Sequence, residues 1–228
     1  MERVIRERKV TPEEGYVRLT AGGISLHGNL LIPKQAKGLV AFAHGSGSSR
    51  HSPRNQYVAQ ILRNNGLATL LFDLLTQEEE AQDLITGEYR FNINLLAHRL
   101  VSATDWLQSN EQTRRLRLGY FGASTGAAAA LVAAAEKGDI VGAVVSRGGR
   151  PDLAGPVLNR VKAPVLLIVG GNDFPVIEMN RQALAKLRGE KELVIVPGAT
   201  HLFEEPGALE HVAKFASDWF VKYLTAET

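Results

Sequence analysis

Short apolar segments alternate with amphipathic helical segments along most of the chain, and this alternation limits the possible folds most strongly. A continuous apolar run such as Gly38–Ala43 suits a strand buried on both faces, as in a parallel sheet. Segments with apolar residues at helical spacing, such as Ile93–Gln108, stand between such runs. Strands joined by crossover helices predict an α/β fold in three layers, with helices on both faces of a mostly parallel sheet.

The pattern predicts eight strands and five helices. We expect strands over Tyr16–Thr20, Ile24–Ile32, Gly38–Ala43, Leu67–Asp73, Leu116–Phe121, Ile140–Ser146, Pro164–Val169 and Leu193–Val196. We expect helices over Tyr57–Asn65, Ile93–Gln108, Thr125–Lys137, Val176–Arg188 and Pro206–Leu224. The turn Ala21-Gly22-Gly23 predicts an antiparallel hairpin of the first two strands. The segment Thr76–Asn92 shows no clear pattern. With no repeat and no linker, we expect a single domain over residues 1–228 with its core at about 16–224.

Composition and charge exclude several classes of protein. The 26 basic and 24 acidic residues give a net charge of +2 with no basic tract, so we expect no nucleic-acid or anionic-membrane partner. The longest apolar run has nine residues, Ala127–Ala135, and is too short to span a bilayer. The charged N-terminus has no apolar segment typical of a signal peptide. We therefore expect a cytoplasmic protein, either a monomer or a homodimer.

Cysteine is absent, which excludes disulfides, thiolate metal sites and a cysteine nucleophile. The chemistry must come from other residues. In a parallel α/β sheet the site lies at the carboxyl ends of the strands. The segments that follow the predicted strands contain a serine, an aspartate and a histidine that fit one another.

Gly122-Ala123-Ser124-Thr125-Gly126 fits G-x-S-x-G, between a strand and a helix as this motif requires. The sharp reversal strains the serine, and glycines two residues to either side remove side chains that would clash. The serine oxygen then stands at a helix N-terminus, where the helix dipole favours negative charge. The alternative is an ordinary glycine-rich turn. We expect Ser124 to be a nucleophile.

A serine hydroxyl needs a base and a group that orients the base. On this fold the order is Ser, then Asp or Glu, then His, and Asp173 and His201 each follow a later strand. We therefore expect the triad Ser124, Asp173 and His201. The rival acids are Asp152, which we expect to cap a helix, and Glu178 inside a predicted helix. Four other histidines are rival bases. His27 lies in a predicted hairpin strand and His98 and His211 lie on predicted helices, where we expect packing or surface roles, whereas His51 precedes the serine in the chain.

The loop His44-Gly45-Ser46-Gly47 follows the third predicted strand. An oxyanion hole on this fold uses the N–H after the nucleophile and one from this loop. We expect these donors to be Thr125 and Ser46. A phosphate-binding loop is the alternative, but the lysine of a Walker motif and the G-x-G-x-x-G spacing are missing.

These motifs resemble the α/β-hydrolase superfamily from about Tyr16 to Leu224, and within it the dienelactone hydrolase-like proteins without a large lid. The segments that carry the resemblance are H-G-S-G-S-S-R-H-S-P-R-N, L-L-F-D-L-L-T, G-A-S-T-G-A-A-A-A and S-R-G-G-R-P-D-L-A-G. Similar proteins also occur fused to phosphoribosyltransferase domains, and we find no such segment in these 228 residues. The resemblance implies the same triad.

The dienelactone hydrolases that give the family its name use a cysteine nucleophile, whereas this chain has Ser124. We therefore expect a serine carboxylesterase that cleaves small esters without a metal or organic cofactor. Thioester or lactone cleavage, acyl transfer and ligand binding without turnover are the alternatives. Arg50, Arg147 and Arg150 lie after predicted strands. They either bind an anionic group of the substrate or form salt bridges between loops.

Overall fold

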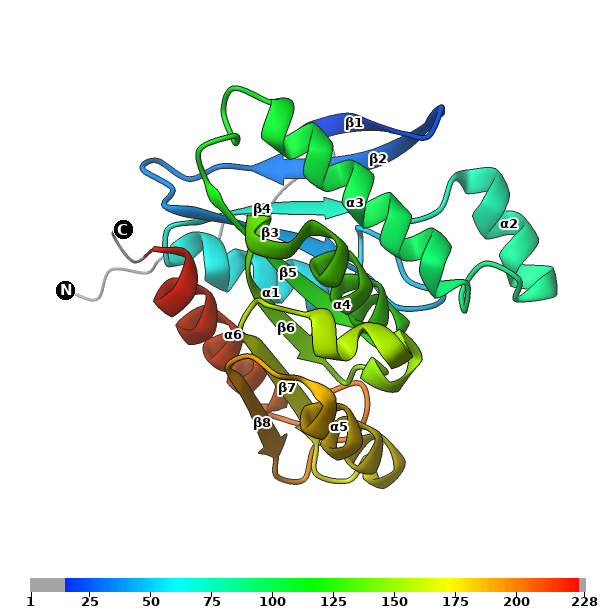
Figure 1. Ribbon diagram of the computed structural model, residues 1–228, viewed down its shortest axis with the longest axis vertical. Helices are drawn as coiled ribbons and strands as arrows, with labels where there is room; N and C mark the ends of the chain where they lie inside the picture. Colours follow the sequence, from blue (N-terminus) through cyan, green and yellow to red (C-terminus); the bar gives the residue numbers. More distant parts are fainter. Residues whose placement is uncertain (1–14, 226–228) are drawn as a thin grey trace.

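The computed structural model describes residues 15–225 and contains an eight-stranded sheet (Figure 1). The strands are β1 (Tyr16–Ala21), β2 (Ile24–Leu31), β3 (Gly38–Ala43), β4 (Leu67–Phe72), β5 (Arg117–Ala123), β6 (Val141–Arg147), β7 (Val165–Gly170) and β8 (Lys191–Val196). Their order is β1-β2-β4-β3-β5-β6-β7-β8. β2 pairs antiparallel with β1 and β4, and the other pairs are parallel. The predicted sheet with its N-terminal hairpin is therefore confirmed.

Helices cover both faces of this sheet. They are α1 (Pro53–Asn64), α2 (Gln77–Thr86), α3 (Ile93–Ser109), α4 (Thr125–Lys137), α5 (Phe174–Lys186) and α6 (Ala208–Leu224), with 3-10 segments at Gly138–Ile140 and Pro151–Arg160. α3, α4 and α5 lie on one face, α1 and α6 lie on the other, and α2 stands apart from the layers (Figure 1). The architecture is the predicted three-layer α/β fold.

The two-sided burial of the sheet explains the continuous apolar runs. In β3, Leu39 packs into the core beneath α3 and α4, whereas Val40 packs into the core beneath α1 and α6. Because successive strand residues point to opposite faces, both faces need apolar side chains. The alanines of α4 at positions 127 to 130 are fully buried, so this helix approaches the sheet closely.

Two helices differ most from the sequence expectation, whereas α3, α5 and α6 differ from their predicted bounds by one or two residues at one or both ends. α1 begins at Pro53 rather than Tyr57, because the Ser52 side chain caps the helix and proline suits its first turn. α2 lies in the segment without a clear pattern. It begins with a capping box of Thr76 and Glu79 and ends at Gly87 in the left-handed region. Within residues 15–225, none of the helices has the length and apolar character needed to cross a bilayer.

Candidate active site

Ser124 lies at the sharp turn between β5 and α4 and has φ 51° and ψ −121°. A non-glycine residue in this region is strained, and such strain is common at functional sites. A methyl group at Gly122 would overlap the backbone of Ala127, and one at Gly126 would overlap the carbonyl oxygen of Ala43. The steric reason for both glycines is therefore confirmed: a Cβ has no room where α4 folds back on β5 at Gly122, nor where α4 meets the end of β3 at Gly126.

Asp173 and His201 follow β7 and β8, which lie side by side. The His201 Nδ1 atom is 2.6 Å from Asp173 Oδ2. The Asp173 side chain is 13% exposed and the His201 side chain 38% exposed, so the carboxylate is shielded while the imidazole reaches solvent. Since a carboxylate only accepts, Nδ1 carries the hydrogen of this bond in neutral His201. The Nε2 lone pair is then left to accept a proton.

The end of β6 joins the serine to this pair. The Ser124 N–H donates to the Arg147 carbonyl at 3.3 Å, and the Gly148 N–H donates to the Ile168 carbonyl at 2.8 Å. A methyl at Gly148 would lie 3.1 Å from the His201 carbonyl oxygen, so the histidine loop packs on this strand end. Within residues 15–225 no hydrogen bond joins the Ser124 hydroxyl to His201. Catalytic hydrogen bonds often form only when substrate is bound.

The predicted oxyanion donors also lie together. The Ser46 and Thr125 hydroxyl oxygens are 3.0 Å apart, although 79 residues separate them in the chain. In the described part of the chain, neither backbone N–H donates to another backbone group. Both N–H groups are thus available to an oxygen of a bound substrate.

His44 fixes the loop that carries Ser46. Its Nε2 accepts a hydrogen bond from the Leu74 N–H at 3.0 Å, so its Nδ1 carries the hydrogen and donates to the Gly45 carbonyl, also at 3.0 Å. Burial lowers the pKa of His44, which keeps the ring neutral and in this tautomer. The sequence indicated the loop but not this role of the histidine.

A small crevice lies beside the predicted oxyanion donors, between the His44 loop and α2. Its lining includes Ser46, Thr125, Leu74, Leu75, Leu84 and Leu96. Charged residues, among them Asp73 and Glu80, line it as well, so apolar and charged side chains both lie beside Ser46 and Thr125. Glu80, Asp83, Leu84 and Arg90, from the segment 76–92 that has no clear sequence pattern, line one side of it. In residues 15–225 no three His, Asp or Glu side chains gather as metal ligands would.

The arginines differ in their partners. The Arg50 N–H donates to Asp73 Oδ1 at 2.8 Å and its guanidinium pairs with Asp73 Oδ2, whereas Arg150 binds Asp152 with bonds of 2.9 and 2.8 Å. The prediction that Asp152 caps a helix is wrong. The residue before the 3-10 segment is Arg150, and the Asp152 carboxylate pairs with it instead.

Arg147 is the exception among these arginines. It is 7% exposed, and within residues 15–225 its guanidinium has neither a hydrogen bond nor an ion pair. Its guanidinium carbon lies over the Phe203 ring, 5.9 Å from the ring centroid. Burial, together with the charge of Arg54, lowers the pKa of Arg147 to about 10. Its Nε is a buried nitrogen without a partner in these residues, and burying a cation without an anion is costly.

The sheet topology, the strained serine between β5 and α4, and a histidine and an aspartate on the following strand ends define an α/β hydrolase. The family model described as the dienelactone hydrolase family matches residues 26–224. The chain belongs to this family.

Known proteins agree with this assignment. A dienelactone hydrolase from Anabaena variabilis ATCC 29413 has a crystal structure with TM-score 0.91 and 64% sequence identity, covering 93% of this chain and 98% of that chain. Est1E from Butyrivibrio proteoclasticus has TM-score 0.76 at 18% identity, covering 92% and 98% of the two chains. The latter similarity shows the fold alone.

Curated relatives are longer. Two Mycobacterium tuberculosis proteins, from strains CDC 1551 / Oshkosh and ATCC 25618 / H37Rv, are provisionally named phosphoribosyl transferases. Each is 58% identical over 208 residues. The match covers 91% of this chain and 46% of the relatives. The chain therefore spans about half the length of these proteins.

Proposed function

We propose that this protein is a serine hydrolase that cleaves small carboxylic esters through an acyl-enzyme. The observation that carries the proposal is the 2.6 Å contact between His201 and Asp173, next to a strained Ser124. Membership of the dienelactone hydrolase family supports hydrolysis as the reaction class. The transferase name belongs to relatives about twice as long, so we do not carry it to this chain.

In the proposed reaction the Ser124 Oγ attacks the ester carbonyl while His201 Nε2 takes the hydroxyl proton. Asp173 holds the imidazole and stabilises the imidazolium. The N–H groups of Ser46 and Thr125 donate to the oxyanion. The C–O bond to the alcohol then breaks, and His201 gives its proton to the leaving oxygen. Water, deprotonated by His201, attacks the acyl carbon; the C–O bond to Ser124 Oγ then breaks, His201 returns its proton to Oγ, and the carboxylic acid is released.

The test is labelling of the folded protein with a fluorophosphonate, followed by peptide mass spectrometry. We expect stoichiometric label on Ser124, none in Ser124→Ala, and a rate at least about 100-fold lower in His201→Ala, because the base is lost. Hydrolysis of short p-nitrophenyl esters should follow the same order. An unlabelled wild-type protein with an intact fold would contradict the mechanism and favour a binding module without turnover.

We further propose that the substrate carries a negative charge, which Arg147 recognises. The argument is the burial of this arginine without an anionic partner and its position at the end of β6, where its carbonyl accepts from the Ser124 N–H. Arg50 and Arg150 pair with Asp73 and Asp152. They are therefore less available to a ligand.

Two esters of equal acyl length test this proposal, p-nitrophenyl hemiglutarate and p-nitrophenyl valerate. We expect kcat/KM to favour the anionic ester about tenfold or more in wild type, and Arg147→Met to remove the preference, since a buried guanidinium–carboxylate pair is lost. Arg150→Met is the matched control and should keep it. Because Arg147→Met removes an unpaired buried charge, it should not lower Tm. A preference that survives in Arg147→Met would exclude this role.

A further inference from the structure

The two proposed oxyanion donors are linked through their side chains. Ser46 comes from the loop after β3 and Thr125 from the first turn of α4. Their hydroxyl oxygens lie 3.0 Å apart, so the two segments that carry the proposed donors are in direct contact. Thr125 is 2% exposed, and its hydroxyl is shielded from competing water.

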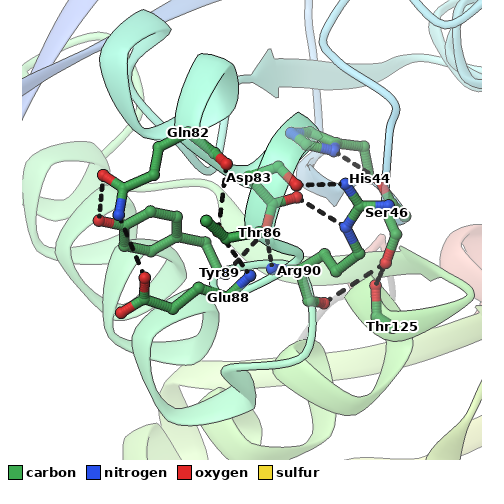
Figure 2. A network of polar contacts seen from close by, with 10 residues as sticks. His44, Ser46, Gln82, Asp83, Thr86, Glu88, Tyr89, Arg90 and Thr125 are labelled. Carbon is green, nitrogen blue, oxygen red and sulfur yellow. Dashed lines mark hydrogen bonds and ion pairs between the residues drawn. The ribbon is translucent and has the colours of Figure 1, made fainter.

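The link continues to a third segment. The Ser46 hydroxyl donates to the carbonyl oxygen of Arg90 at 3.4 Å, and Figure 2 shows the three residues in a row. The Ser46 hydroxyl has one hydrogen: when it points to Arg90, the Thr125 hydroxyl donates to Ser46, and when it points to Thr125, Ser46 is the donor of the shorter contact. In the first arrangement the hydrogen bonds run from Thr125 through Ser46 to the backbone of residue 90.

Asp83 holds that backbone in place. Its Oδ1 accepts from the N–H groups of Tyr89 and Arg90 at 2.7 and 2.9 Å, and its Oδ2 accepts from Arg90 Nε at 2.8 Å. Arg90 Nη2 donates to the Asp83 carbonyl at 2.6 Å. We call this set of contacts between Asp83, Tyr89 and Arg90 the Asp83 clasp.

Asp83 is the buried member of the clasp, whereas the Arg90 side chain is 28% exposed. Asp83 is 4% exposed and is the one buried residue of this helix. Burial raises the pKa of its carboxyl, but the hydrogen bonds from Arg90 and Tyr89 outweigh this effect and the pKa is lowered overall. Asp83 is thus ionised at neutral pH. The neighbouring contacts of Gln82 with Glu88 and Tyr89 are exposed.

We propose that the Ser46–Thr125 contact, anchored on the Asp83 clasp, positions the oxyanion hole by fixing the separation of the two backbone N–H donors. The inference rests on the proposed function. Oxyanion donors must lie 2.7–3.1 Å from the developing charge, and a shift of about 1 Å costs about 100-fold in rate. The two loops have no other direct side-chain hydrogen bond in the described residues. Thr125, Ser46 and Asp83 are therefore positioning residues.

Thr125→Val tests the inference, because valine keeps the N–H and the side-chain shape but lacks the hydroxyl. We expect kcat for p-nitrophenyl butyrate to fall about tenfold with KM changed less than about twofold, since the oxyanion forms only in the transition state. The affinity for butylboronic acid, which adds to the serine as a tetrahedral anion, should fall by a similar factor. Thr125→Ser restores the hydroxyl and should recover at least about a third of kcat.

Asp83→Asn tests the anchor. We expect kcat to fall about threefold to tenfold while KM changes less than about twofold, because the clasp loses its charge-assisted hydrogen bonds. Glu88→Gln, on the exposed side of the same segment, is the matched control and should retain wild-type kcat. Ser46→Ala, in an exposed loop, provides a second variant if Thr125→Val does not fold. The Ser46→Ala/Thr125→Val double variant should lose little more than either single variant.

Three results would overturn the inference. The first is wild-type kcat and boronic acid affinity in Thr125→Val or Ser46→Ala. The second is an equal loss in Thr125→Ser and Thr125→Val, since the hydroxyl would then be irrelevant. The third is a rise in KM that accounts for the whole effect. Failure of the proposed function is distinguishable, because wild-type protein would then leave Ser124 unlabelled by the fluorophosphonate.

Discussion

Replacement of Asp173 by asparagine isolates the contact on which the proposed mechanism depends. The Asp173 Oδ2 atom is 2.6 Å from His201 Nδ1, within the range of a short charge-assisted bond. An asparagine that donates its amide N–H to Nδ1 forces the hydrogen onto Nε2, so the imidazole cannot accept the Ser124 proton. In residues 15–225 no second carboxylate pairs with His201. We therefore expect no substitute for the lost orientation.

The expected loss is about 10³ to 10⁴ in kcat, or about 4 to 5.5 kcal/mol of transition-state stabilisation. We would measure steady-state kcat and the pre-steady-state burst of p-nitrophenol from p-nitrophenyl acetate, with Tm recorded alongside. Asp152→Asn is the matched control, because this carboxylate pairs with Arg150 at 2.8 Å and is not part of the triad. Retention of more than a tenth of kcat/KM in a folded Asp173→Asn protein would refute the reasoning.

Two further predictions concern stability. Gly126→Ala places a methyl group against the carbonyl oxygens of Ala43 and His44. We expect the free energy of unfolding to fall by about 2–3 kcal/mol, measured by urea denaturation. A urea midpoint equal to that of wild type would contradict this. Burial lowers the pKa of His44 despite opposing effects of Gly45, Asp73 and Glu80. As the pH falls, the unfolded chain therefore takes up this proton at a higher pH than the folded protein does. The contribution of neutral His44 to the free energy of unfolding is fully present above about pH 6.5 and decreases below this pH. His44→Gln cannot take up the proton, so its Tm should fall less than that of wild type between about pH 7.5 and about pH 5.5; equal falls would show that His44 does not contribute.

The elements that the sequence predicted well are those whose pattern is local. β3 and α4 have the predicted bounds, because a strand buried on both faces and a helix between two glycines leave clear signals. α2 was missed since only Asp83 is buried, while Leu84 and Ile85 are 71% and 88% exposed. A helix without a buried apolar stripe lacks the periodicity that identifies helices. Its capping box and Gly87 were the local signals that could have found it.

For the site, the sequence by itself determined which residues stand at the carboxyl ends of the strands. The steric demands of the Ser124 turn act over a few residues, and the order of strands along the chain fixes where Asp173 and His201 can emerge. Their distance, the isolation of Arg147 and the meeting of Ser46 with Thr125 were decided by the tertiary structure. These contacts depend on strand order, sheet twist and loop path, which bring together segments 28 to 79 residues apart. No local pattern encodes such distances, because each results from the packing of the whole sheet and its helices.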